Sequence, residues 1–128
     1  MIELASGCVD SVSAPPLVPI ERPIDLEHLS RMTLGERSLE SELLRLFDRQ
    51  AVMLLERMQQ AAPAIAAASA HTLKGSALGI GAWAVARAAG LVELAAGTQG
   101  ADLKVPLRSL AICIAEARAV ITDLLRAH

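Results

Sequence analysis

Aromatic residues are almost missing from this sequence, which has one tryptophan and one phenylalanine among its 128 residues. The β-strands of globular proteins favour aromatic and β-branched side chains, whereas alanine and leucine favour helices. Here 53% of the residues are hydrophobic, and alanine and leucine supply much of that fraction. The composition therefore predicts an all-α protein with an aliphatic core, and the length is that of one domain.

Clusters of basic residues are missing too. The 12 basic and 14 acidic residues are mixed along the chain and give a net charge of −2, so we expect no nucleic-acid partner. Cysteine is scarce: Cys8 and Cys113 lie far apart and match no metal-ligand spacing, which indicates reduced thiols in a cytoplasmic protein. No signal-peptide pattern is present, and the most apolar stretch, residues 77–86, is too short to span a bilayer. We expect no membrane insertion.

Residues 1–23 have no clear period and are predicted to form an extended or disordered arm, followed by a helical domain over residues 24–128. The arm contains four of the six prolines: Pro15, Pro16, Pro19 and Pro23. It also contains three apolar side chains: Leu17, Val18 and Ile20. They either pack against the helical domain or extend into solvent. The sequence leaves both alternatives open.

Capping residues and apolar periodicity predict the first two helices. Asp25 is a good N-cap for a short helix that ends near Gly35 and has Leu26, Leu29 and Met32 on one face. A long helix then begins at Glu36 or Ser38 and runs to about residue 61. Its expected core-facing residues are Leu39, Leu43, Leu46, Phe47, Leu54 and Met58.

Three further helices follow. Pro63 suits the first turn of the next helix, which should end near Gly79. Another spans about residues 82–96, and the loop 98–100 separates it from a last helix that begins between Asp102 and Pro106. The last helix has apolar residues at alternating spacings of four and three: Leu103, Leu107, Leu110, Ile114, Ala117, Ile121 and Leu124. We therefore expect an antiparallel four-helix bundle with a short N-terminal capping helix.

The helix that begins near Pro63 carries a single histidine on its outward face. At about 100° per residue, His71 shares that face with Lys74, Gly75 and Leu78. Earlier turns of the same face carry Ala64, Ala67 and Ala68. The opposite face should supply the core: Ala66, Ser69, Leu73, Ala77 and Ile80. This pattern indicates a solvent-facing nucleophile that a large partner approaches.

The run His71-Thr72-Leu73-Lys74-Gly75-Ser76-Ala77, followed by Leu78-Gly79-Ile80-Gly81-Ala82, resembles the signature of histidine-containing phosphotransfer (HPt) domains. The resemblance covers about the last hundred residues. It implies a helical bundle that takes a phosphoryl group from a receiver-domain aspartate, or from a kinase, and passes it to another receiver aspartate. It also implies response-regulator receiver domains and a hybrid histidine kinase as partners. We expect such a bundle to be a monomer, and to be a phosphocarrier without an ATP-binding kinase domain of its own.

The residue types suit this chemistry. A neutral imidazole is a competent nucleophile near pH 7, so His71 is the expected phosphorylated residue. Lys74, one turn along, can offset charge on the phosphoryl oxygens, and Gly75 keeps the approach to His71 open. In an alanine-rich chain, glycine at that position costs about 1 kcal/mol of helix propensity, which suggests a steric requirement. No cofactor is expected, because no acidic cluster accompanies His71 in the sequence and Mg²⁺ would come from the partner receiver.

Several other residues have plainer interpretations. The face formed by Ala64, Ala67, Ala68 and Leu78, which we term the apolar rim, is the candidate docking surface for a receiver, although incidental exposure explains Ala67 and Leu78 equally. Ser76 is expected to pack or to hydrogen bond near the core rather than to bind phosphate. Trp83 is expected to pack, and His28 and His128 are expected to have no catalytic role.

Other functions fit less well. Three scattered histidines do not form a metal-hydrolase ligand set. A histidine-kinase dimerisation domain would need an ATP-binding partner segment, and His71 is followed by Thr72 rather than by an acid. The remaining alternative is a non-catalytic helical interaction or scaffold module that docks receiver-like partners, for which His71 would be dispensable. The sequence does not identify the partners or the direction of phosphate flow.

Overall fold

The computed structural model describes residues 22–127, and these form five α-helices without a strand. The helices are α1 (Leu26–Met32), α2 (Arg37–Gln60), α3 (Pro63–Ile80), α4 (Trp83–Ala96) and α5 (Lys104–Ala127). The expected N-terminal arm lies outside the described residues except for its last two positions, and Cys8 and His128 lie outside them as well.

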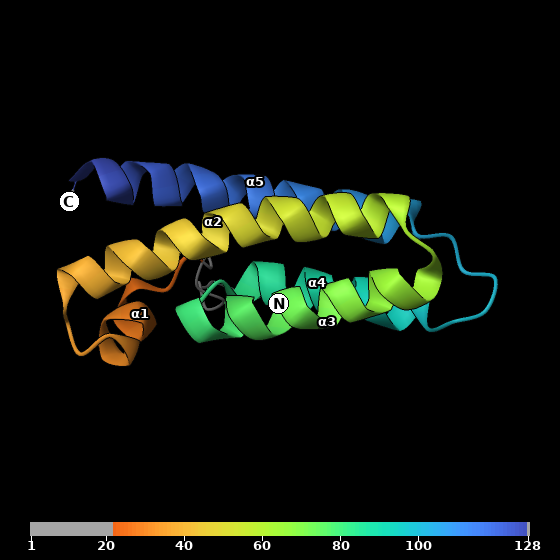
Figure 1. The fold of residues 1–128 in the computed structure, drawn as a ribbon, viewed down its shortest axis with the longest axis horizontal. Coiled ribbons are helices and arrows are strands. Elements are labelled where there is room, and N and C mark those ends of the chain that lie inside the picture. Colours follow the sequence, from red (N-terminus) through yellow and green to blue (C-terminus); the bar gives the residue numbers. More distant parts are fainter. Residues whose placement is uncertain (1–21, 128) are drawn as a thin grey trace, which may run out of the picture.

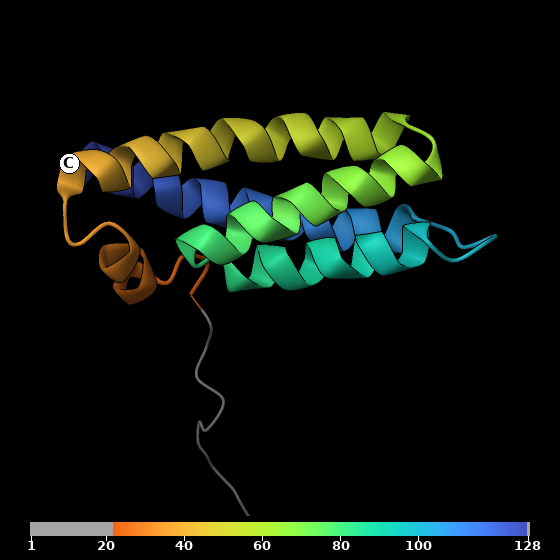
Figure 2. The same cartoon turned by 60° about the horizontal axis from the view of Figure 1, so that its bottom comes forward.

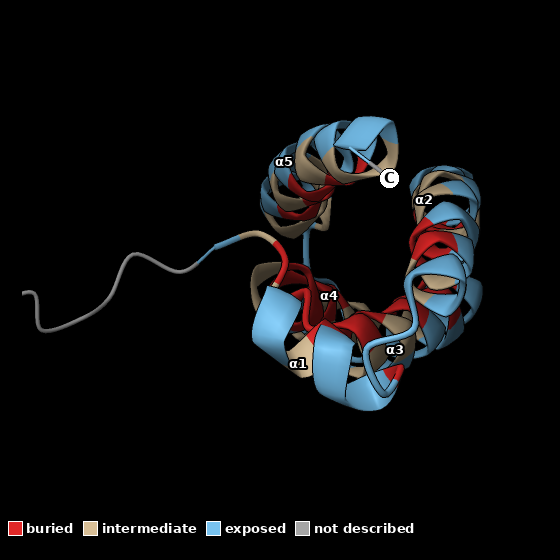
Figure 3. Cartoon of the chain, turned by 90° about the vertical axis from the view of Figure 1, so that its left-hand side faces the viewer, coloured by how far each residue is buried: buried red, intermediate tan, exposed pale blue. Residues whose placement is uncertain are grey.

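The four long helices run alternately up and down, so that consecutive helices are antiparallel (Figures 1 and 2). Helix α2 contacts α3 and α5, and α4 contacts the same two helices, which closes the ring α2–α3–α4–α5. Seen from the end, the buried residues of each helix face the middle of this ring, and α1 lies at one end of the bundle, against α3 (Figure 3). The structure is the predicted all-α four-helix bundle with a short capping helix.

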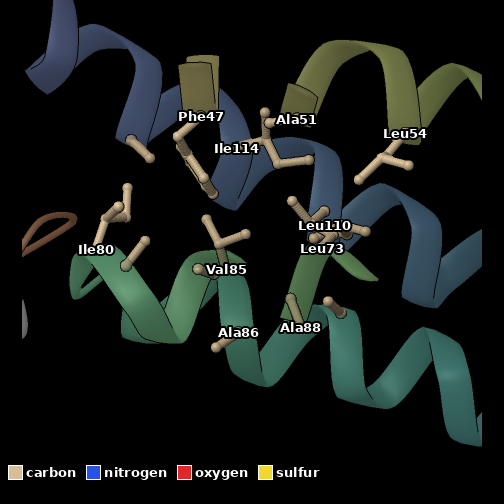
Figure 4. Close-up of a cluster of buried hydrophobic side chains, with 14 of the residues drawn as sticks. Phe47, Ala51, Leu54, Leu73, Ile80, Val85, Ala86, Ala88, Leu110 and Ile114 are labelled. Carbon is tan, nitrogen blue, oxygen red and sulfur yellow. The ribbon is translucent and has the colours of Figure 1, made fainter. Parts of the chain in front are cut away.

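The core is aliphatic, with Phe47 as its one aromatic side chain (Figure 4). The predicted seam of the last helix is confirmed: Leu110, Ile114, Ala117 and Ile121 are buried, and the remaining members are partly buried and pack against the core: Leu103, Leu107 and Leu124. The back of α3 is buried as predicted, and every residue of that set is less than a tenth exposed: Ala66, Ser69, Leu73, Ala77 and Ile80. Alanine on both α3 and α4 lets the two helices approach closely, because it adds little bulk between them.

Two predicted apolar faces were partly wrong. In α1 only Leu29 is buried, and Leu26 and Met32 are 42% and 56% exposed, because this short helix covers only the end of the bundle. In α2, Leu39 and Leu46 are 40% and 47% exposed, and Ser41 and Leu44 are buried in their place, whereas Phe47, Leu54 and Met58 are buried as predicted. Leucines occupy both positions 43 and 44, so the apolar pattern there fits two helix faces that differ by one residue.

The predicted helix ends agree well with the observed ones. Pro63 occupies the first turn of α3, and α2 begins at Arg37, between the two expected start positions. Helix α3 extends to Ile80, one residue past Gly79, and Gly81 then adopts a left-handed conformation with φ of 83°. A side chain at Gly81 would place its Cβ 3.0 Å from both Cβ and O of Asp25, so this turn requires glycine for its backbone and for its space.

Asp25 connects α1 to the turn between α3 and α4 through hydrogen bonds. One of its carboxylate oxygens accepts a hydrogen bond from the backbone N–H of His28, and the other accepts one from the indole N–H of Trp83, both at 3.0 Å. Its own N–H donates to the carbonyl of Gly81, and the His28 ring lies 3.2 Å from the carbonyl of Gly79. The end of the helix that carries His71 is therefore held in place by α1.

Candidate functional site

His71 lies in the middle of α3, on its solvent side, with 69% of its side chain exposed. Lys74 is half-buried one turn further along the helix, and Gly75 is exposed beside it. The helical periodicity predicted this arrangement, because the core residues of α3 lie on the opposite face. The imidazole is therefore accessible to a macromolecular partner.

A carboxylate from α4 joins the two polar residues of α3. The Nδ1 atom of His71 lies 2.9 Å from Oε2 of Glu93, and the Nζ atom of Lys74 lies 3.4 Å from Oε1 of the same side chain. Glu93 thus bridges an imidazole and an ammonium group with its two oxygens. This triad of His71, Lys74 and Glu93 is the main cluster of charged groups on the α3–α4 surface.

The electrostatics of the triad keep Glu93 ionised. Partial burial acts to raise the pKa of Glu93, but the hydrogen bond and charge of His71, followed by those of Lys74, outweigh it and hold that pKa below its ordinary value. An ionised carboxylate accepts hydrogen bonds and has no proton to donate. The hydrogen bond therefore assigns a proton to Nδ1 of His71, and in the neutral ring the lone pair lies on Nε2.

The face of α3 that carries His71 has open space at Gly75, one turn further along the helix. A Cβ built on Gly75 would meet no heavy atom within 4 Å, so the position opens directly to solvent. Of the apolar rim, Ala64, Ala68 and Leu78 are exposed and Ala67 is half-buried. The structure therefore brings the rim and His71 together on one face of α3.

The other residues considered from the sequence lie in structural positions. Ser76 is half-buried and lines a cavity of about 280 Å³ between α2 and α3, where Phe47 and Leu43 are neighbours. Trp83 packs edge-on against the His28 ring, with 4.8 Å between ring centroids. His28 belongs to the Asp25 junction at the end of the bundle.

Among residues 22–127, no three histidine, cysteine or acidic side chains gather as a metal site would require. None of the helices in this range combines the length and the apolar character needed to cross a membrane.

Glu93 was not predicted from the sequence. Its contact with His71 joins residues 22 positions apart on different helices, and helical periodicity within α3 does not reveal which residue of α4 lies opposite. One signal was available: Glu93 is the only acidic residue of α4 and one of its two charged residues, and a charge on a mostly apolar helix is stabilised only by an interhelical partner or by solvent.

Fold and site together define a class: a four-helix bundle that presents one exposed histidine, backed by a carboxylate, to a partner. A comparison with family models identifies the family, because the Hpt domain matches residues 42–127, which span α2 to α5. The chain therefore belongs to the Hpt domain family and carries a histidine phosphotransfer module of phosphorelays. Comparisons with curated proteins and with solved structures gave no match.

Proposed function

We propose that His71 is the phosphocarrier of a two-component phosphorelay. It accepts a phosphoryl group from a receiver-domain aspartate, or from a kinase, and passes it to the aspartate of another receiver. The observation that carries the proposal is a histidine side chain that is 69% exposed and whose Nδ1 lies 2.9 Å from a carboxylate oxygen of Glu93, which leaves Nε2 as the nitrogen with the lone pair.

The chemical step is a displacement at phosphorus. The Nε2 lone pair of His71 attacks the phosphorus of the aspartyl phosphate, an N–P bond forms, and the bond between phosphorus and the aspartate oxygen breaks. The aspartate leaves as a carboxylate. The ring, still protonated on Nδ1, becomes a phosphorylated imidazolium, and the reverse displacement delivers the phosphoryl group to the next aspartate.

Two charged residues offset the charges that this step creates. Glu93 faces Nδ1, so its negative charge stabilises the imidazolium ring that forms as Nε2 is phosphorylated. Lys74 lies within reach of the same region, and its ammonium group offsets the charge of the phosphoryl oxygens. The role of the protein is to orient and to compensate charge, and no cofactor of its own is involved. Mg²⁺ is bound by the receiver.

The approach of a receiver depends on small and apolar residues around His71. Gly75 leaves space next to the imidazole, and the apolar rim supplies surface that docking would bury. We assign response-regulator receiver domains and a hybrid histidine kinase as partners, a monomeric state to the carrier, and the cytoplasm as its compartment.

Incubation with a phosphorylated receiver tests the proposal. The protein should acquire phosphate that is labile to acid and stable to base, as a phosphohistidine is, and His71→Gln should acquire none. A scaffold that only docks receivers would bind the receiver equally with or without His71 and would acquire no label. That result would overturn the proposal.

A further inference from the structure

Gly90 lies in the interior of α4, where glycine is less favourable than alanine, the commonest residue of this helix. Its backbone does not have a positive φ, so the conformation does not require glycine. A Cβ built at this position would meet one neighbouring atom within 4 Å, the Cδ of Lys74 at 3.5 Å. The space that Gly90 leaves open is therefore next to the aliphatic stem of Lys74.

The path of Lys74 explains why this space matters. Its stem passes over α4 at Gly90, and its ammonium group reaches Glu93, which lies three residues further on and on the same face of α4. Lys74 and Gly90 together line both cavities of the groove between α3 and α4, which measure about 460 and 540 Å³. The lysine stem thus crosses the groove where α4 has no side chain.

We infer that Gly90 is a positioning residue for Lys74. It leaves space for the lysine stem, and this holds the Lys74 ammonium group against Glu93, the carboxylate that also contacts His71. The functional part of this inference rests on the proposed phosphocarrier role of His71. Its structural part concerns only the contact between Lys74 and Glu93 in the unphosphorylated protein.

Close helix packing is the competing explanation for a glycine between two helices. It would predict that a Cβ at position 90 meets the backbone or the core side chains of α3. The only neighbour is instead a methylene group in the flexible side chain of Lys74. Gly90 is also half-buried rather than buried, so a larger side chain there does not have to enter the core.

Two substitutions separate a side chain that fits from one that does not. Gly90→Ala adds one carbon at an ordinary contact distance from Lys74 and should leave its path unchanged. Gly90→Val adds two further methyl groups, and the restricted χ1 angle of a β-branched residue in a helix limits how far they turn away. Both residues have a higher helix propensity than glycine, so the pair controls for helix stability.

The first measurement needs no phosphotransfer. Carboxyl ¹³C NMR of the unphosphorylated protein reports the titration of Glu93, which is faced by two charged groups, His71 and Lys74. Because Lys74 helps to lower the pKa of Glu93, Gly90→Val should raise that pKa towards the value found in Lys74→Met. Gly90→Ala should titrate as the wild type does. A wild-type titration for Gly90→Val would overturn the inference.

The second measurement is the rate of phosphoryl transfer to His71. Gly90→Val should slow transfer about as much as Lys74→Met, and the double variant should be no slower than Lys74→Met alone. If the two effects multiply, Gly90 does not act through Lys74 and the inference is wrong. If no variant accepts phosphate, the wild type included, the proposed function fails while the Glu93 titration still decides the positioning role.

If Gly90→Val does not fold, the inference can still be tested on the wild-type protein. A nuclear Overhauser effect between the Lys74 Hδ and Gly90 Hα protons is expected, because Cδ of Lys74 lies 3.5 Å from the point where a Cβ on Gly90 would stand. Its absence from a fully assigned spectrum would overturn the inference without any variant.

Discussion

The Nδ1 atom of His71 lies 2.9 Å from Oε2 of Glu93, and this contact joins the middle of α3 to the last turn of α4. It fixes which ring nitrogen carries the proton and leaves the lone pair on Nε2 of a side chain that is 69% exposed. The same carboxylate also lies 3.4 Å from the ammonium group of Lys74. The geometry of the site therefore depends on one residue that does not lie on the helix of the histidine.

Replacement of Glu93 should slow phosphoryl transfer, and the loss should be smaller for glutamine than for alanine. In Glu93→Gln the amide oxygen still accepts from Nδ1 while the charge is lost, and in Glu93→Ala both are lost. We expect transfer to fall in the order wild type, Gln, Ala, with about a tenfold loss for Ala, by analogy with the carboxylates that orient metal-bound histidines. Single-turnover transfer from a phosphorylated receiver measures this, and equal rates for all three proteins would contradict it.

His71→Gln should keep the fold and abolish phosphate acceptance. The side chain is 69% exposed and contributes little to the core, and glutamine is polar, compatible with a helix and unable to form the phosphoramidate. Circular dichroism checks the fold, and the acid lability of bound label checks the chemistry. The variant retains His28 and His128, so any residual phosphohistidine would show that a different histidine is the carrier.

Lys74→Ala should slow transfer more than it weakens receiver binding, because its role is assigned to charge on the phosphoryl group. The side chain is 39% exposed, so solvent limits the effect to about 1 kcal/mol, or about a fivefold change in rate. The other lysine, Lys104 at the start of α5, provides the matched control through Lys104→Ala. Lower affinity at an unchanged rate would place Lys74 among the docking residues instead.

Local signals were sufficient to predict the architecture. The N-cap Asp25, the first-turn Pro63 and the left-handed Gly81 each act through backbone geometry within a few residues, so the helix ends could be located from them. The heptad-like spacing in α5 likewise determined its buried face. In α2 the adjacent leucines at 43 and 44 made the pattern ambiguous, and packing against α3 and α5 selected Leu44.

Contacts between helices could not be predicted in the same way. Glu93 meets His71, and Trp83 meets Asp25 across 58 positions, only because the bundle sets the relative rotation and height of its helices. Those two quantities follow from the packing of many side chains at once, and single-helix periodicity does not contain them. The same holds for Gly90, because the sequence does not show that a Cβ at this position would meet the stem of Lys74.

Asp25 holds α1 against the turn before α4, and acid should weaken this attachment by protonating its carboxylate. The hydrogen bond from the backbone of His28, followed by that from Trp83, lowers the pKa of Asp25 below its ordinary value near 3.8. A lowered pKa means that ionised Asp25 stabilises the folded state fully above the ordinary pKa. This contribution is lost as the pH falls through the lower, folded-state value.

Asp25→Asn measures that contribution. Asparagine offers one oxygen acceptor where the carboxylate offers two, so it leaves either His28 N–H or the Trp83 indole without its partner. The melting temperature of the variant should lie below that of the wild type by a constant amount from about pH 7 to pH 5, and the gap should shrink below the ordinary pKa. A gap that widens in acid would contradict the assignment.

Gly75 is where stability and function are expected to diverge. It lies within α3 without a positive φ, and a Cβ there would meet nothing within 4 Å. Gly75→Ala should therefore stabilise the bundle by about 0.4–1 kcal/mol, because alanine restricts the unfolded chain without a clash in the folded one. Thermal melting measures this, and the same protein serves as the small-residue control for a larger substitution.

Gly75→Gln should fold with normal helix content and transfer phosphate poorly, by about tenfold or more. The side chain would project into solvent one turn from His71, where the incoming aspartyl phosphate must align with Nε2. Gly75→Ala, which adds only a methyl group, should transfer much faster than Gly75→Gln. If Gly75→Gln unfolds, position 75 makes a helix contact and the histidine face is not open to a partner. If it folds and transfers at the wild-type rate, the glycine has no steric role and the receiver approaches His71 from another side.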